Sequence, residues 1–200
     1  MKTAFLVFQI MFLLNLLGCA TPRTNPNMPQ LISDSEYESV IASNSDKKQV
    51  YDGFYAVMEV SGTMINSKVL KAQLEQRARI YQWTPEILAS EKVKQDAKMA
   101  KETEFFISFF VPERKHDDLH KAKTLWKLFL DANGRRYEGK SSRMKTILSD
   151  VVSLYPQHNR WSTPYIVSFP VPVSMIENGG AILTITGPAG STTLSFKAVP

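Results

Sequence analysis

Apolar and polar residues alternate with a period of two along much of this chain, and that pattern most limits what the chain can fold into. Every second residue from Tyr165 to Val173 is apolar. Side chains of a β-strand point alternately to opposite faces, so the alternation predicts a strand with one buried face. Pro170 and Pro172 cannot donate ladder hydrogen bonds, so this segment lies at a sheet edge or leaves the sheet. The other alternating segments are residues 50–65, 102–111, 124–131 and 181–199.

Short stretches between the alternating segments are typical of hairpin turns. Asn133-Gly134 lies between two strand-like runs, and Asn-Gly favours a two-residue turn because both residues tolerate positive φ. Residues 187–190 contain two glycines and a proline, and we expect Leu183 and Leu194 to lie on paired strands on either side of them. We predict a single strand over residues 50–65, with a buried face formed by Phe54, Ala56, Met58 and Val60.

One part of the chain carries helical signals instead. Apolar residues recur at spacings of four along residues 67–82, which is typical of one buried helix face. Thr84-Pro85 is typical of a helix start, because Thr caps the first backbone N–H groups and Pro fits the first helical position. These segments predict a helical hairpin over about residues 67–100. A third amphipathic stretch falls at residues 142–155.

Strands separated by turns dominate the chain, so we predict a mainly β fold. The expected architecture is an Ig-like β-sandwich with the helical hairpin inserted between strands. The alternative is an α+β domain whose helices pack on one antiparallel sheet. Cys19 is the only cysteine, so no intrachain disulfide can stabilise the fold. Eleven Phe, seven Tyr and three Trp supply large side chains for a packed core.

The N-terminus consists of Lys2 and an apolar run from Ala4 to Leu17. A membrane-spanning helix needs about 20 apolar residues, and this run is shorter. A basic residue, a short apolar run and a small residue before the cleavage point are the parts of a secretory signal peptide. We therefore expect residues 1–18 to direct export and to be removed.

The stretch Leu16-Leu17-Gly18-Cys19 resembles the lipobox of bacterial lipoproteins. The resemblance covers residues 1–19 and implies cleavage before Cys19, a diacylglycerol on the Cys19 thiol, and a further acyl chain such as palmitate on the new amino group. Two or three such chains anchor a protein stably in a membrane. Ala20 stands where an Asp would retain the protein at the inner membrane, so the outer membrane is favoured if the bacterium is Gram-negative.

Residues 19–36 are rich in Pro and small polar residues, a composition typical of a flexible tether. We expect this tether to hold the remaining chain away from the bilayer. Residues 37–200 are enough for one domain with its own core, and we expect a single β-rich domain there.

The formal net charge of +5 is concentrated between Glu113 and Lys145, a window with ten Lys or Arg and five Asp or Glu. A basic face suits anionic lipid head groups, acidic polysaccharide or an acidic protein. The alternative is an ordinary solvated surface. Nucleic acid is a poor partner for an exported chain. The residues expected at a contact surface are Arg114, Lys115, Lys121, Lys123, Arg135, Arg136, Lys140 and Trp161.

Residues 134–141, GRRYEGKS, match the P-loop pattern G-x-x-x-x-G-K-[ST]. The middle residues are Arg, Arg, Tyr and Glu, which are bulky for a loop that surrounds phosphates with its backbone amides. A hairpin turn at Asn133-Gly134 accounts for the first glycine without a nucleotide. We therefore expect no nucleotide and no other cofactor.

The stretch HDDLH places His116 and His120 four residues apart, the spacing at which a helix presents two imidazoles to one metal ion. The segment lies between two predicted strands and has room for only a turn or two of helix. His158 is the remaining histidine and a candidate third ligand. A solvated loop is the alternative explanation of this stretch.

The sequence contains no G-x-S-x-G motif, which would indicate a serine nucleophile. Acylation would leave the Cys19 thiol unable to act as a nucleophile. We therefore expect a membrane-anchored envelope lipoprotein that is not an enzyme. It would bind an envelope protein or an anionic polymer, or have a structural role. The alternative is a metal-dependent hydrolase that uses His116 and His120. Trp126, Trp161 and Tyr165 are candidates for a stacking surface, although sandwich aromatics more often belong to the core.

Overall fold

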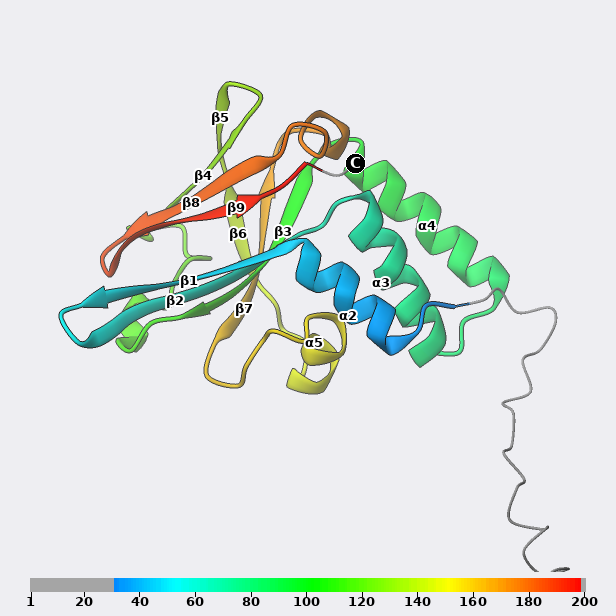
Figure 1. Ribbon diagram of the computed structural model, residues 1–200, viewed down its shortest axis with the longest axis horizontal. Helices are drawn as coiled ribbons and strands as arrows, with labels where there is room; N and C mark the ends of the chain where they lie inside the picture. Colours follow the sequence, from blue (N-terminus) through cyan, green and yellow to red (C-terminus); the bar gives the residue numbers. More distant parts are fainter. Residues whose placement is uncertain (1–30, 199–200) are drawn as a thin grey trace, which may run out of the picture. The chain divides into compact units, whose positions relative to one another are not determined.

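Two antiparallel sheets face each other in the computed structural model, which describes residues 31–198 (Figure 1). The larger sheet has the strand order β1-β2-β3-β7-β6 and the smaller sheet the order β5-β4-β8-β9. The larger sheet consists of β1 (Ser45–Asp52), β2 (Tyr55–Met64), β3 (Thr103–Phe110), β7 (Thr163–Phe169) and β6 (Lys140–Arg143). The smaller sheet consists of β5 (Arg135–Glu138), β4 (Lys127–Ala132), β8 (Ala181–Gly187) and β9 (Gly190–Phe196). The predicted signal peptide, Cys19 and residues 20–30 of the predicted tether lie outside the described residues.

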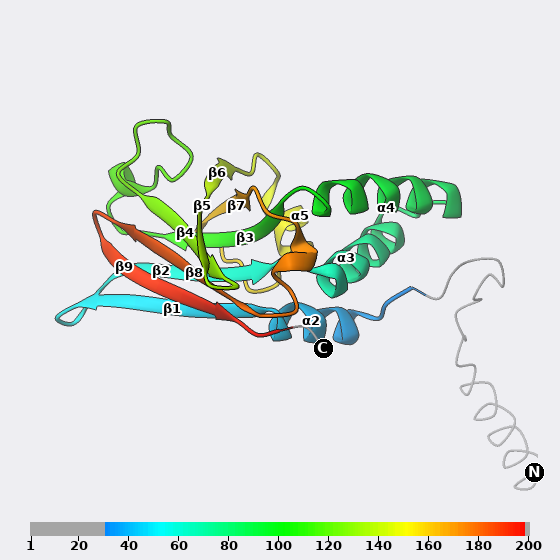
Figure 2. The ribbon, with the colours of Figure 1, turned by 90° about the horizontal axis from the view of Figure 1, so that it is seen from above.

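Helices join the strands and gather mainly at one end of the sandwich (Figures 1 and 2). The helical hairpin predicted between strands is present, and Thr84 accepts a hydrogen bond from the backbone N–H of Ile87. None of the helices in residues 31–198 is both long and apolar enough to cross a membrane. The helices are α2 (Asp34–Ser43), α3 (Ser67–Ile80), α4 (Pro85–Met99) and α5 (Leu148–Leu154), with short 3-10 helices η2 (Arg114–His116) and η3 (Val173–Met175).

The alternating residues of both sheets meet in one core, so the predicted sandwich is confirmed. Phe105 of β3 is fully buried there. Its ring centroid lies 5.7 Å from that of Phe169 in the same sheet and 5.0 Å from that of Phe196 in the opposite sheet. Aromatic pairs at such distances stabilise a core beyond the burial of their area. Aromatic packing between the sheets therefore stabilises this sandwich without an intrachain disulfide.

Two predicted turns are also confirmed. Ala132 pairs with Arg135, and the residues between them, Asn133 and Gly134, have φ of 50° and 71°. Gly134 thus belongs to a hairpin turn, as its position after Asn133 predicted. Leu183 pairs with Leu194 across the β8–β9 turn.

The prediction of one strand over residues 50–65 is wrong. The segment folds back on itself at Gly53, whose φ of 58° is readily adopted by glycine, and β1 pairs with β2. Phe54, predicted on the buried face, is fully exposed at this turn. Met58 and Val60 are buried as expected.

Helix α5 covers the outer face of the larger sheet. The Phe106 ring lies flat on Tyr155, with 3.6 Å between centroids, and edge-on to His158. His158 is buried, and its Nδ1 lies 2.8 Å from Oγ of Ser108 on β3. Burial lowers the pKa of His158 below its usual value, because the charged imidazole loses its hydration.

Helix α2 packs against α3 and begins within the segment predicted as tether. Residues 34–36 form its first turn, and Ser33 caps it by accepting a hydrogen bond from the Glu36 N–H. Tyr37 is buried, and its hydroxyl donates to the Leu154 carbonyl at 2.6 Å. The globular part of the chain therefore includes α2.

The two ends of the sandwich differ. Helices α2, α3 and α4 lie at one end, where the described chain begins, whereas the β1–β2 hairpin and the β8–β9 turn project at the other (Figures 1 and 2). We call the latter the hairpin end.

Two Phe→Ala substitutions test this account of the core. Phe105→Ala should lower the free energy of unfolding by about 3–5 kcal/mol, because it leaves a cavity between the sheets. Phe54→Ala removes a fully exposed ring and should change the free energy of unfolding by less than about 0.5 kcal/mol. Chemical denaturation measures both values. Equal losses for the two variants would contradict the described packing.

The burial of His158 predicts a pH dependence of stability. Its folded-state pKa is lowered, so the unfolded chain takes up a proton first as pH falls below about 6.5. Stability present at pH 7 should then decline towards pH 5, by at most about 1.4 kcal/mol per pH unit from this group. His158→Gln should flatten the decline, and His120→Gln, at an exposed histidine, should not. Denaturation series at pH 5, 6 and 7 measure the slopes, and identical slopes in all three proteins would refute the assignment.

Candidate functional site

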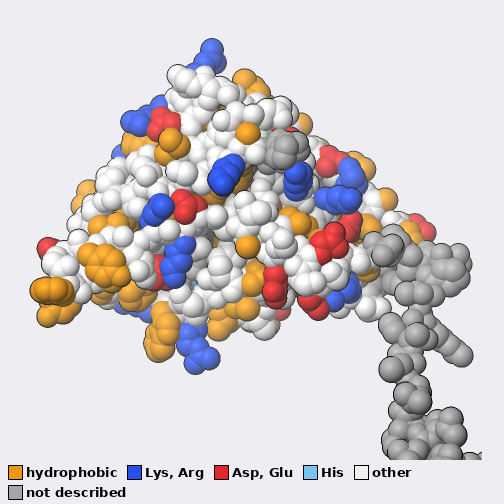
Figure 3. Space-filling view, viewed as in Figure 1, with side chains coloured by type: hydrophobic (Ala, Val, Ile, Leu, Met, Phe, Trp, Pro, Cys, Tyr) orange, Lys and Arg blue, Asp and Glu red, His pale blue; other side chains and the backbone are white. Residues whose placement is uncertain are grey.

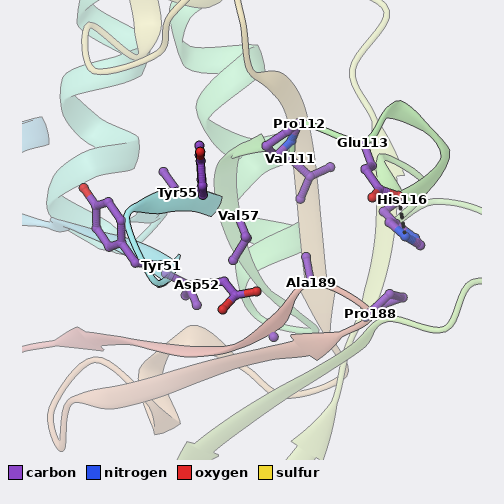
Figure 4. Close-up of a pocket in the computed structure, with 13 residues that line it drawn as sticks. Tyr51, Asp52, Tyr55, Val57, Val111, Pro112, Glu113, His116, Pro188 and Ala189 are labelled. Carbon is purple, nitrogen blue, oxygen red and sulfur yellow. Dashed lines mark ion pairs between the residues drawn. The ribbon is translucent and has the colours of Figure 1, made fainter.

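Two concavities lie at the hairpin end, on either side of the segment that contains η2. The first, which we call the apolar cleft, has a volume of about 650 Å³ and is drawn in Figure 4. It is bounded by the β1–β2 hairpin, the end of β3 and the β8–β9 turn. Its apolar walls are formed by Val50, Ala56, Val57, Val111, Pro112, Pro188 and Ala189.

The rim of the apolar cleft carries the first of the predicted metal ligands. His116 Nε2 lies 3.3 Å from Glu113 Oε2 (Figure 4). Lys115 and, to a lesser extent, His116 hold the pKa of Glu113 below its usual range. The His116 carbonyl accepts a hydrogen bond from Trp126 Nε1 at 2.8 Å, which fixes η2 against the core. The His116 imidazole thus already contacts one carboxylate, that of Glu113.

The second concavity, which we call the basic groove, has a volume of about 580 Å³ and is lined mainly by cations and polar groups. Arg114 and Lys121 come from the segment around η2, Arg143 from the end of β6, and Arg160 from the loop before β7. Trp161 completes the lining, and 66% of its surface is exposed. Cationic side chains from three separate segments thus converge on one concavity beside an accessible indole.

The carboxylate in the lining of the basic groove is Asp117, and other groups engage it. It accepts hydrogen bonds from the Thr163 hydroxyl at 2.6 Å and the Tyr165 hydroxyl at 2.9 Å. Only 6% of the Asp117 side chain is exposed, and Arg114 lies 3.5 Å away. Burial, together with Asp117, raises the pKa of Tyr165, so this hydroxyl remains a donor. Asp117 thus supplies one negative charge, nearest to Arg114, in a lining that holds four cations.

Those cations have no other carboxylate partner in the part of the chain that the structure describes. Lys121, Arg143 and Arg160 take part in none of the ion pairs within residues 31–198. Arg143 also lines an adjoining concavity of about 780 Å³ along β6, with Lys145 on its wall. The basic surface therefore continues from the groove along the edge of the larger sheet.

The predicted contact surface is divided by the fold. Arg114, Lys121 and Trp161 meet in the basic groove. Lys115 and Lys123 are exposed on the same connection between β3 and β4 but outside the groove lining. Lys140 lies on β6, and Arg135 and Arg136 lie on β5 of the smaller sheet.

Two groove residues, Arg143 and Arg160, were missing from the predicted surface. Arg143 falls within the basic window of the sequence, and Arg160 directly precedes Trp161. Their neighbours in sequence were thus the only available signal. Of the aromatic candidates, Trp126 and Tyr165 are buried in the core, and Trp161 alone is exposed.

The three histidines occupy different environments. His116 lies on the rim of the apolar cleft, His120 lines the basic groove, and His158 is buried in the loop after α5, against Ser108 of β3. Within residues 31–198, no group of three or more His, Cys, Asp or Glu side chains is arranged to hold a metal ion.

Comparisons with protein-family models, with curated proteins and with solved structures found no match to this chain.

Proposed function

We propose that this protein is a lipid-anchored, non-enzymatic binding module of the bacterial cell envelope, and that its basic groove binds an acidic polysaccharide. The anchor follows from the resemblance of residues 16–19 to a lipobox. It places the protein outside the cytoplasm, on the outer membrane if the bacterium is Gram-negative. The main support for the binding role is that four cations converge on one concavity: Arg114, Lys121, Arg143 and Arg160.

The charge of the groove favours an anionic ligand. Asp117 is the one carboxylate in a lining with four cations, so most of the positive charge remains available to a ligand. Guanidinium groups bind carboxylates and sulfates through paired N–H donors, and Arg143 and Arg160 are both exposed for such contacts.

The shape and the indole favour a polymer of sugars. The exposed ring of Trp161 offers an apolar face on which a sugar ring can stack. The adjoining concavity shares His120 and Arg143 with the groove, so a chain with repeated acid groups would find cations along its length. A single small anion would use only part of this surface.

The hydrolase alternative gains no support from the described residues. It requires His116 and His120 to hold one metal ion, yet His116 contacts Glu113 beside the apolar cleft and His120 lines the basic groove. A binding role needs no such arrangement.

Removal of two groove cations should weaken binding of polygalacturonate by about tenfold at low salt, because two charge-assisted contacts are lost. The test compares Arg143→Ala/Arg160→Ala with the wild type by calorimetry between 20 and 300 mM NaCl, where the wild-type affinity should fall steeply. The matched control is Arg135→Ala/Lys197→Ala, which removes the same net charge from exposed positions on the smaller sheet or next to it. Equal losses in both double variants would show a non-specific charge effect and contradict the groove.

Trp161→Ala should weaken polygalacturonate binding by about fivefold through the loss of ring stacking. Its dependence on salt should remain that of the wild type, since no charge is removed. Leu125→Ala, at another exposed apolar side chain of the loops, serves as the control. An unchanged affinity in Trp161→Ala would remove the sugar-stacking role and leave an ordinary anion site.

A further inference from the structure

The tip of the β1–β2 hairpin carries an exposed group of aromatic rings, Tyr51, Phe54 and Tyr55, which we call the aromatic tip. The exposed fractions of these residues are 57%, 100% and 80%. In Figure 3, hydrophobic side chains gather at the end of the molecule where this hairpin projects. A fully exposed Phe between exposed Tyr residues is unfavourable in water and points to an apolar or interfacial environment.

The aromatic tip extends beyond the neighbouring strand of its sheet. Glu59 of β2 pairs with Phe110, the last residue of β3, so residues 55–58 extend beyond that neighbour and pair with β1 alone. The apolar cleft lies between the hairpin and the end of β3, and Tyr51 and Tyr55 line its outer side while most of their surface stays exposed (Figure 4). The other end of β1 is fixed, since Asp46 accepts a hydrogen bond from the Ser195 N–H of β9 at 2.9 Å.

The composition of the tip fits the boundary between lipid and water. Phe and Tyr are suited to this region because the rings enter the apolar layer while the Tyr hydroxyls stay hydrated. Asp52 is the only charged residue from Val50 to Met58. The tip therefore lacks the cations that would select anionic lipids, unlike the basic groove.

The chain is long enough for the tip to reach the membrane that carries the anchor. Fourteen residues separate Cys19 from Asp34, and a chain of that length spans at most about 50 Å. Helix α2 and strand β1 lie between Asp34 and the turn at Gly53, which are therefore at most about 45 Å apart. This distance is no greater than the reach of the chain between Cys19 and Asp34, so the anchor and the tip can meet the same bilayer.

We infer that the aromatic tip inserts into the lipid–water interface of the bilayer in which the acyl chains of Cys19 are anchored. The inference rests on the lipid-anchor part of the proposed function and is independent of polysaccharide binding. Anchor and tip together would fix the orientation of the domain, so that the sandwich lies along the membrane.

The test uses the chain processed in bacteria and purified from their membranes. Acylation consumes the thiol of Cys19, the only cysteine, so Asp52→Cys introduces a single reactive thiol at the tip. An environment-sensitive fluorophore on this thiol should shift to the blue in phosphatidylcholine vesicles and be quenched by lipids that carry a quencher at shallow depth. Asp96→Cys, at an exposed Asp on α4, is the matched control and should show neither effect.

Adding Phe54→Ser/Tyr55→Ser to Asp52→Cys should reduce the quenching at least about fivefold, because the rings that enter the interface are lost. Flotation with the vesicles should persist through the anchor, and 500 mM NaCl should leave the quenching unchanged. If the protein floats but the labels at residues 52 and 96 respond equally, the tip insertion is refuted and the anchor stands. If the protein does not float, the anchor and the insertion are both refuted. The polysaccharide assay still tests ligand binding in the basic groove separately.

Discussion

The indole of Trp126 links the core of the sandwich to both concavities at the hairpin end. Its ring meets Phe109 edge-on at 5.1 Å and lies so close to Gly187 that a Cβ there would be 2.4 Å from it. Its Nε1 donates to the His116 carbonyl. One buried side chain thus joins the two sheets and fixes the segment that separates the apolar cleft from the basic groove. A glycine at position 187 is required by this close approach.

The sandwich could be predicted from sequence because its strands follow one rule, with alternate residues buried between two sheets. The prediction failed at residues 50–65, because the apolar alternation from Phe54 to Val60 begins within the turn and places Phe54 on the same face as Met58. Periodicity reports which residues share a face of an unbroken strand, and it cannot reveal that the backbone reverses. Helix α2 was missed for a related reason: its buried residues Tyr37 and Ile41 are too few to stand out among polar neighbours.

The candidate site was predictable only in part, because convergence depends on tertiary contacts. The sequence placed Arg114 and Arg135 in one basic window, yet η2 and β5 put them on different parts of the fold. Arg160 lies outside that window and reaches the groove because the start of β7 pairs with the end of β3. Charge counted along the chain therefore locates a basic region, whereas the grouping of individual cations follows strand pairing.

In the basic groove, several cations surround one buried carboxylate, that of Asp117. A buried carboxylate is costly unless hydrogen bonds replace its hydration, and the hydroxyls of Thr163 and Tyr165 supply them. Both donors come from β7, a strand held between β3 and β6, so Asp117 stays in the floor of the groove. From there it attracts Arg114 and reduces the repulsion among the cations, while Lys121, Arg143 and Arg160 keep their outer faces in solvent. The groove keeps a net positive charge because the one carboxylate in its lining faces four cations.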